Sequence, residues 1–338
     1  MKQKLMICAF AALGLIGCKH YAHEVYVSSI NGSDDNLGTQ ESPFKTIARA
    51  HNFAIENGIG EDTASFTFYL EGTFEIEGDD WGTGLYYHNN NIIGYGNGNA
   101  VLKFSQKDYG IWLEDEAPTN LKNLTISNVS GCGINIENSG AFMENCIIEN
   151  CTEGGIRTGF DSYLYMKNCI VRNNTKTSSG AGIEASYTAM HLDNCQIINN
   201  KTVGESVSTN GGGIYIMNGT GKYEDGYLIE NCVISGNEAH NTGGGICANI
   251  RDIEREPYTI KIKNTKISGN TAYDAGGLVV YEFVTVEASD VEVTGNTATN
   301  SCGGICVIDN TIIPAKGTLT GDYVCKSNTP DDLVTYKR

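Results

Sequence analysis

Basic residues are scarce in this sequence. Its 338 residues include 23 lysines and arginines against 40 aspartates and glutamates, which gives a formal net charge of −17. Binding to a phosphate backbone depends on clustered basic side chains, so we expect no nucleic-acid partner. An acidic polysaccharide would also be repelled on average, unless a local basic patch or a bound divalent cation reverses the charge at one site.

Proline and charged residues are sparse as well. The chain has 5 prolines against 41 glycines, and 19% charged residues against 40% hydrophobic ones. This composition excludes a largely disordered chain and favours an all-β protein with many tight turns. After the first eighteen residues, no apolar run is long enough to span a bilayer.

The first eighteen residues have the features of an export signal. Two lysines precede an apolar run over residues 5–16, as in a secretory signal peptide. The ending Leu15, Ile16, Gly17, Cys18 resembles the bacterial lipobox, which implies that residues 1–17 are removed and that Cys18 is lipidated. An ordinary signal peptide with a chance cysteine is the alternative. We expect an exported protein on the outer membrane, facing the periplasm or the surface, held there only by its lipid.

Internal repeats dominate the rest of the chain. The phrase GNEAHNTGGGICA (236–248) returns as GNTAYDAGGLVV (269–280) and GNTATNSCGGICV (295–307). A second segment, of the type NCVISGN, recurs every 22 to 37 residues. Its first residues are Asn123, Asn145, Asn168, Asn194, Asn231, Asn264 and Asp290. Each unit thus has two short strands, cannot bury its own apolar face, and must stack on its neighbours.

Stacked units place one residue of each unit in a common row. Glycine suits the corners, where backbones approach closely or need a positive φ, and the aliphatic after it points inward. The predicted inward row is Ile134, Ile156, Ile183, Ile214, Ile246, Leu278 and Ile305. This organisation resembles the right-handed parallel β-helix of the pectin-lyase-like fold, with its stacked asparagines. The GN-x-A-x-x-x-GGGI phrase is similar to the repeats of polymorphic outer-membrane proteins.

The N-terminal segment carries a second resemblance. YVSSINGSDDNLGTQESPFKTIARAHNFA (26–54) is similar to the beginning of many secreted bacterial β-helix proteins, polysaccharide lyases among them. We expect a short amphipathic cap helix that ends at Gly58, and first strands within residues 65–76. The prediction is therefore an all-β, single-stranded right-handed parallel β-helix over residues 24–338. Its parts are a cap and first strands (26–76), regular coils (about 90–307) and a closing segment (308–338).

Cysteine usage favours packing over disulfides, although the chain is exported and has twelve cysteines. Cys146, Cys169, Cys195 and Cys232 hold the same place in four consecutive coils, so we expect reduced thiols in an inward row. No pair of CxxC motifs indicates zinc.

The residue after each inward aliphatic points outward. This row is Asn135, Arg157, Glu184, Tyr215, Cys247, Val279 and Cys306. In β-eliminating lyases of this fold, an outward Lys or Arg removes a proton beside a uronate carboxylate, and acidic residues hold Ca²⁺. The resemblance thus makes Arg157, Asp161 and Glu184 candidate catalytic residues, while a surface ion pair is the plainer interpretation. The apolar end of the row is expected to be covered by the segment after residue 307 or by a partner.

Two other features are candidate ligand sites. Insertions at 217–227 and 249–258 would form a lip, in which Tyr223, Arg251, Arg255 and Tyr258, with Tyr215 beside them, could hold a sugar. Solvated loops are the alternative. In GSDDNLGT (32–39), Asp34, Asp35 and Asn36 could bind Ca²⁺, or could simply form a polar turn. No organic cofactor is indicated.

Two functions fit these observations. The first is a non-catalytic, adhesin-like lipoprotein that binds a glycan or an envelope or host partner. The alternative is a Ca²⁺-dependent polysaccharide lyase that cleaves uronate-containing polysaccharide by β-elimination. A fold that serves both classes does not choose between them.

Overall fold

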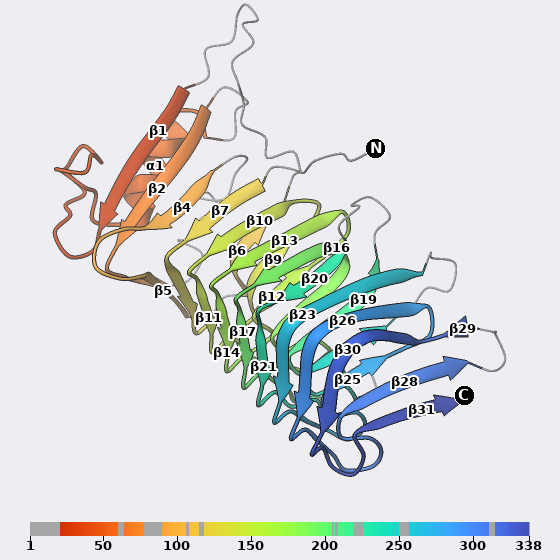
Figure 1. The fold of residues 1–338 in the computed structure, drawn as a ribbon. Coiled ribbons are helices and arrows are strands. Elements are labelled where there is room, and N and C mark those ends of the chain that lie inside the picture. The colour runs from red at the N-terminus through yellow and green to blue at the C-terminus, as the bar shows by residue number, and fades with distance from the viewer. Residues whose placement is uncertain are drawn as a thin grey trace, which may run out of the picture.

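The chain winds into a stack of coils whose strands pair in parallel from coil to coil (Figure 1). The computed structural model describes residues 21–59, 64–77, 90–105, 108–114, 118–204, 206, 209–219, 226–249, 257–310 and 315–337. The stack runs from β1 and α1 at one end to β31 at the other (Figure 1). None of the helices in these ranges is long and apolar enough to cross a membrane.

Three faces, here called A, B and C, surround the core. Face A contains β6 (Tyr109–Leu113), β9 (Cys132–Ile136), β12 (Ile156–Thr158), the start of β16 (Ile183–Asp193), β19 (Ile214–Gly219), β22 (Ile246–Asn249), β25 (Leu278–Val280), β28 (Ile305–Asn310) and β31 (Leu333–Lys337). Face B contains β1 (Tyr21–Ser28), β2 (Ala64–Glu71), β4 (Asn91–Gly94), β7 (Pro118–Lys122), β10 (Gly140–Glu144), β13 (Ser162–Lys167), the end of β16, β20 (Tyr227–Glu230) and the starts of β23 (Tyr258–Ser268), β26 (Val284–Thr294) and β30 (Thr318–Lys326).

Face C closes the coil. It contains β3 (Thr73–Glu77), β5 (Ala100–Ser105), β8 (Leu124–Ser127), β11 (Ile147–Glu149), β14 (Ile170–Arg172), β17 (Gln196–Ile198), β21 (Val233–Ser235) and the ends of β23, β26 and β30. Short strands lie at the corner between faces C and A: β15 (Thr175–Lys176), β18 (Lys201–Thr202), β24 (Thr271–Ala272) and β27 (Thr297–Ala298). The remaining strand, β29 (Ala315–Lys316), pairs antiparallel with β28.

The inward rows follow the sequence prediction. The aliphatic row from Ile134 to Ile305 is in continuous register, and each member is at most 1% exposed. Full burial of each such side chain stabilises the folded protein by about 1.5–3 kcal/mol. The predicted cysteine row is also confirmed, because Cys146, Cys169, Cys195 and Cys232 are buried and free.

Two asparagine ladders run along the stack. The predicted one is largely exposed, and its members adopt positive φ, as at Asn145 (55°) and Asn168 (54°). The second ladder was not separated from the turns by sequence reasoning, and it is buried. It consists of Asn174, Asn200, Asn237, Asn270, Asn296 and Asn328. Each of the first five donates from its backbone N–H and its Nδ2 to the Oδ1 of the next, over 2.9–3.1 Å.

This buried ladder explains the repeated glycines. A Cβ on Gly245 would lie 2.5 Å from the carbonyl oxygen of Gly277 and 3.0 Å from Asn270 Nδ2. Gly243, two residues earlier, has a φ of +69°. The glycine run therefore meets two separate requirements, close backbone approach at one position and left-handed backbone at another.

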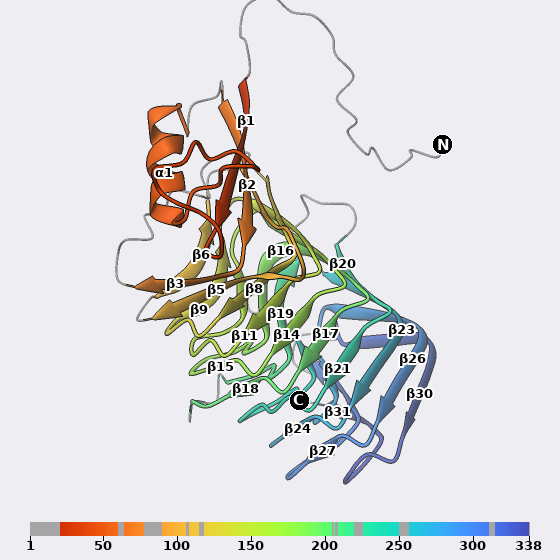
Figure 2. The ribbon, with the colours of Figure 1, turned by 90° about the vertical axis from the view of Figure 1, so that its left-hand side faces the viewer.

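A helix covers the N-terminal end, as predicted. α1 spans Ile47–Glu56, and the Thr46 side chain accepts a hydrogen bond from Arg49 N at its start. Ile47, Ala50 and Ala54 form its buried side. Figure 2 shows α1 standing beside β1 and β2 at this end of the stack.

At the other end, the coils extend beyond residue 307. Where the sequence suggested a closing segment, β30 pairs with β26 and β31 with β28, so the chain adds another coil. The alternation in residues 318–326 continues the strand pattern, and pairing satisfies the backbone groups of β26 and β28. The segment therefore extends the outward row with Val334 rather than folding across it.

Candidate functional site

Face A carries two hollows on its outer side. The first, here called the charged hollow, has a volume of about 440 Å³. Its lining residues are Asp108, Tyr109, Ser130, Gly131, Cys132, Glu153, Arg157, Lys176, Ser178 and Glu184. The second, here called the tyrosine hollow, has a volume of about 260 Å³ and lies nearer the C-terminal end. Its lining residues are Asn241, Thr242, Asp274, Val279, Tyr281, Asn300, Ser301, Cys306, Ile308 and Tyr336.

The charged hollow brings together two of the three predicted catalytic residues. Arg157 on β12 and Glu184 on β16 are register partners, and Arg157 Nε lies 3.8 Å from Glu184 Oε2. Arg157 Nη1 lies 4.0 Å from Glu137 Oε1 on its other side. Asp161 is exposed, with a φ of 53°, and is not among the lining residues.

The main partner of Glu184 is a lysine that sequence reasoning missed. Lys176, on β15, is only 5% exposed, and its Nζ contacts Glu184 Oε2 directly. A buried ammonium group needs such a partner, because desolvation of an unpaired charge is expensive. With Asp108 and Glu153, the hollow holds three carboxylates and two cations.

The described residues contain no cluster of three or more His, Cys, Asp or Glu that could hold a metal ion. The three predicted Ca²⁺ ligands all make hydrogen bonds within the loop before α1. Asp34 Oδ1 accepts from the backbone N–H groups of Lys45 and Thr46, at 3.0 and 2.9 Å, and Asp34 Oδ2 accepts from Thr46 Oγ1. Asn36 Nδ2 donates to Pro43 O at 2.8 Å, and Asp35 donates its backbone N–H to Ser33 Oγ. These contacts favour the polar-turn interpretation.

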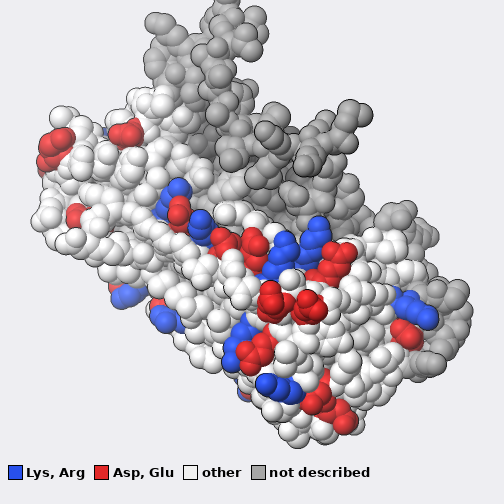
Figure 3. Space-filling model, in the orientation of Figure 1, with Lys and Arg blue, Asp and Glu red and all other residues white. Residues whose placement is uncertain are grey.

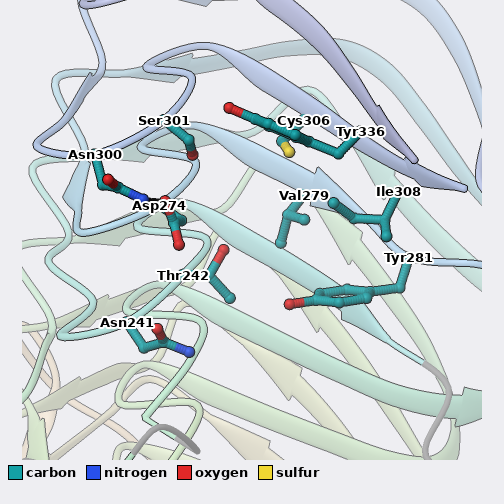
Figure 4. A pocket seen from close by; sticks show the side chains of 10 residues that line it. All are labelled: Asn241, Thr242, Asp274, Val279, Tyr281, Asn300, Ser301, Cys306, Ile308 and Tyr336. Atoms are coloured by element: carbon teal, nitrogen blue, oxygen red, sulfur yellow. Dashed lines mark hydrogen bonds between the residues drawn. The ribbon is translucent and has the colours of Figure 1, made fainter. Parts of the chain in front are cut away.

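The tyrosine hollow has an aromatic and aliphatic side facing a polar side. In Figure 4, Tyr281 and Tyr336 lie on either side of Val279 and Ile308, and both hydroxyls are directed toward the polar side. The polar side consists of corner residues that precede β22, β25 and β28: Asn241, Thr242, Asp274, Asn300 and Ser301.

Register explains how the apolar side is assembled. Val279 and Cys306 are partners on the outward row, and Ile308 and Tyr336 are partners two residues further along. Val279, Cys306 and Ile308 belong to a second apolar cluster, separate from the main core, which also includes Tyr215 and Cys247. The outward row is therefore covered largely by its own neighbours. Because Tyr215 is only 7% exposed, it is a packing residue, contrary to its predicted role as a ligand-binding side chain.

Hydrogen bonds hold part of the polar side in place. Asn300 Nδ2 donates to Asp274 Oδ1 at 2.9 Å, and Asn241 Nδ2 donates to Asn210 Oδ1 at 2.8 Å. A phenol is already protonated at neutral pH, and partial burial raises the pKa of Tyr336 further, so its hydroxyl can both donate and accept.

Most of the predicted lip lies outside the described residues. Tyr223, Arg251, Arg255 and the lipidation residue Cys18 lie outside the described residues. Tyr258 does not serve as an exposed sugar ligand, because it is 9% exposed and its hydroxyl donates to Asn249 O at 2.7 Å. As the first residue of β23, it takes an inward position opposite Val284 and packs against Tyr227.

A model of the right-handed β-helix region matches residues 74–324, so the chain belongs to the right-handed β-helix family. This membership confirms the predicted all-β, right-handed parallel β-helix. No curated protein sequence matches the chain.

Several solved structures are similar to the chain at low identity. Pectate lyase Pel9A is 13% identical with a TM-score of 0.45, and the match covers 95% of this chain and 76% of that one. A rhamnogalacturonan lyase is 13% identical with a TM-score of 0.42, over 93% of this chain and 87% of that one. ORF18 of Geobacillus virus E2 is 9% identical with a TM-score of 0.47, and the match covers 93% of this chain and 60% of that one. These likenesses concern the fold alone.

Proposed function

We propose that this protein is a non-catalytic, lipid-anchored glycan-binding protein of the bacterial envelope, and that the tyrosine hollow is its binding site. The observation that carries the proposal is the pairing of Tyr281 and Tyr336 with a wall of amides, hydroxyls and one carboxylate. Sugar rings present C–H faces that pack on aromatic side chains, and hydroxyls that exchange hydrogen bonds with such groups.

The composition of the hollow favours neutral sugars. Asp274 is the one charged residue among those that line it, and no lining residue is cationic. A uronate carboxylate would therefore be left without a partner beside Asp274, at a cost in binding free energy. Together with the net charge of −17, this argues for a neutral ligand.

One observation favours the lyase as a second candidate. The charged hollow places Arg157 and Lys176 together on the outward side of a β-helix, as a base and its helper would have to be placed. Against this, Lys176 is bound to Glu184, and Arg157 lies between two glutamates. A uronate entering the hollow would meet three carboxylates.

The envelope location is supported by the sequence alone, through the lipobox-like end at Cys18. If the lipid anchor exists, Cys18→Ser removes the incorporation of labelled palmitate and releases the protein from the membrane fraction. Unchanged labelling in that variant would contradict the anchor and leave the binding proposal untouched.

Glycan binding is tested with the full chain in detergent, on an array of neutral and uronate-containing glycans. We expect a neutral glycan to bind, and Tyr281→Ala and Tyr336→Ala each to weaken it about tenfold, or ~1.4 kcal/mol. Tyr69→Ala is the matched control, since Tyr69 is a half-buried tyrosine on β2, at the opposite end of the stack. Binding that both hollow variants retain in full would refute the assignment.

A further inference from the structure

Face B carries a cluster of aromatic side chains on three consecutive strands. The cluster, here called the aromatic platform, consists of Phe142 on β10, Tyr163 and Tyr165 on β13, and His191 on β16. Phe142, Tyr165 and His191 are register partners on one outward row, and Tyr163 lies beside this row, opposite Gly140. The platform is on a different face from both hollows.

The rings contact one another across the strands. Ring centroids are 5.2 Å apart for Phe142 and Tyr163, 6.1 Å for Phe142 and Tyr165, and 5.0 Å for Tyr165 and His191. Phe142 remains 39% exposed, and Tyr163 and Tyr165 are half-buried. A Cβ at position 140 would lie 2.1 Å from Tyr163 Cζ, so glycine is what allows the Tyr163 ring to lie over that strand.

Sheet stability alone does not account for these residues. Cross-strand aromatic pairs do stabilise a sheet, by roughly 0.2–1 kcal/mol each. Yet the same outward row has no aromatic residue on either side of the platform, with Asn120 before it and Leu228, Lys261 and Glu287 after it. The strands there pair in the same way without an aromatic side chain in this row, so the platform is a local addition to a regular scaffold.

A charged row borders the platform. Two residues further along each strand, Glu144, Lys167, Asp193 and Glu230 are register partners. Figure 3 shows acidic and basic side chains mixed in a band along the molecule, with neither sign dominating it. His191 Nε2 lies 2.8 Å from Glu230 Oε1, which joins the platform to this row. Hydrogen-bond donors and acceptors thus stand beside exposed rings, and the excess of carboxylates over ammonium groups in this row disfavours an anionic glycan.

We propose that the aromatic platform is a second glycan-binding surface, which takes consecutive rings of a neutral polysaccharide lying along the stack. Strands in a sheet are about 4.8 Å apart, which is close to the length of one pyranose unit. Aromatic rings on successive rungs can therefore meet successive sugars, while the charged row reaches their hydroxyls. The platform extends the proposed glycan binding to another face and does not require the tyrosine hollow.

Affinity electrophoresis of the full chain in gels containing hydroxyethylcellulose, galactomannan or xylan tests this surface. We expect retardation by at least one of these polysaccharides, and a tenfold or greater loss of affinity in the double variant Phe142→Ala/Tyr165→Ala. Tyr165→Phe, which keeps the ring, should bind like the unmodified protein. Leu228→Ala changes an apolar residue on the same outward row and is the matched control.

The outcomes separate this surface from the tyrosine hollow. If polysaccharide binding is lost in Phe142→Ala/Tyr165→Ala and kept in Tyr281→Ala, the platform is supported even if the tyrosine hollow binds nothing. Retention in the platform variant overturns the proposal, whatever Tyr281→Ala does. An equal loss in Leu228→Ala also overturns it, because the effect would then come from altered packing of face B. Absence of retardation by any of the three polysaccharides overturns it as well.

Discussion

Removing one asparagine from the buried ladder should destabilise the protein far more than removing one from the largely exposed ladder. Asn237 is fully buried and joins three coils. Its Oδ1 accepts from Asn200 N and Asn200 Nδ2 at 2.9 and 3.0 Å, and its Nδ2 donates to Ile197 O at 2.8 Å and to Asn270 Oδ1 at 3.0 Å. Asn237→Ala leaves these groups where water does not reach them.

The expected magnitude follows from the orphaned groups. Asn200 loses the acceptor of its backbone N–H and one of its two Nδ2 acceptors. Ile197 O and Asn270 Oδ1 each lose the Nδ2 donor of residue 237, while Asn270 Oδ1 keeps the backbone N–H of that residue. At about 1–3 kcal/mol for each unsatisfied buried group, the variant should lose roughly 3–5 kcal/mol of unfolding free energy. Asn237 has an ordinary negative φ, so alanine adds no backbone strain.

Asn231→Gly is the matched control. Asn231 is exposed and has a φ of +58° that glycine tolerates. Its Nδ2 donates to Asp193 Oδ1 and its Oδ1 accepts from Asn264 Nδ2, and water can replace both of these exposed hydrogen bonds. We expect a loss of about 1 kcal/mol. Guanidinium unfolding followed by circular dichroism measures both variants. If Asn237→Ala costs no more than Asn231→Gly, the buried ladder is not the stabilising element that the hydrogen bonds indicate.

Three further predictions concern glycine, thiol chemistry and catalysis. Gly245→Ala should lower the unfolding free energy by about 3 kcal/mol or prevent folding, because the added Cβ would clash with a neighbouring backbone. Gly269 has open space around it but a φ of +64°, so Gly269→Ala should lower the unfolding free energy by only about 1–2 kcal/mol. Thermal unfolding measures both variants. Burial raises the pKa of the Cys325 thiol to about 11, so its alkylation should be slow at pH 8 and accelerate as pH rises toward 11; a rate that levels off near pH 9 would contradict this. Uronate-containing polysaccharides should give no unsaturated-uronate absorbance with either Ca²⁺ or EDTA, and a Ca²⁺-dependent rise that Arg157→Ala abolishes would establish the lyase instead.

The repeats made the fold and its register predictable. Because alternation has a period of two, one well-chosen aliphatic per coil determines which neighbours point in and which point out. The residues from Ile134 to Ile305 therefore predicted the core, and Arg157 and Glu184 were correctly placed on adjacent rungs. The same reasoning placed the buried cysteines, since they hold one position in successive units.

Corners and strand beginnings were less predictable. Lys176 lies at a corner, where unit lengths vary and no period assigns a direction to the side chain. Tyr258 begins a strand directly after an insertion, so its inward position depended on where pairing resumes. The buried ladder did have a signal, the repeated Gly-Asn at Asn237, Asn270 and Asn296, but in sequence it cannot be told from a turn. Sequence reasoning missed Tyr336 because residues 308–338 were expected to close the end of the stack rather than to add another coil.

The two proposed surfaces follow from one property of this scaffold. Inward positions must keep the same size and polarity from coil to coil, because each side chain packs between its own copies above and below. Outward positions carry no such restraint, so a row can change from amide to aromatic to aliphatic to charged within a few rungs. The row through Asn120, Phe142, Tyr165, His191, Leu228 and Lys261 does so. Rows that change abruptly are therefore where a function can be added without disturbing the core. The platform on face B and the tyrosine hollow on face A are two such places, and the rigid ladders between them hold each in a fixed geometry before any ligand arrives.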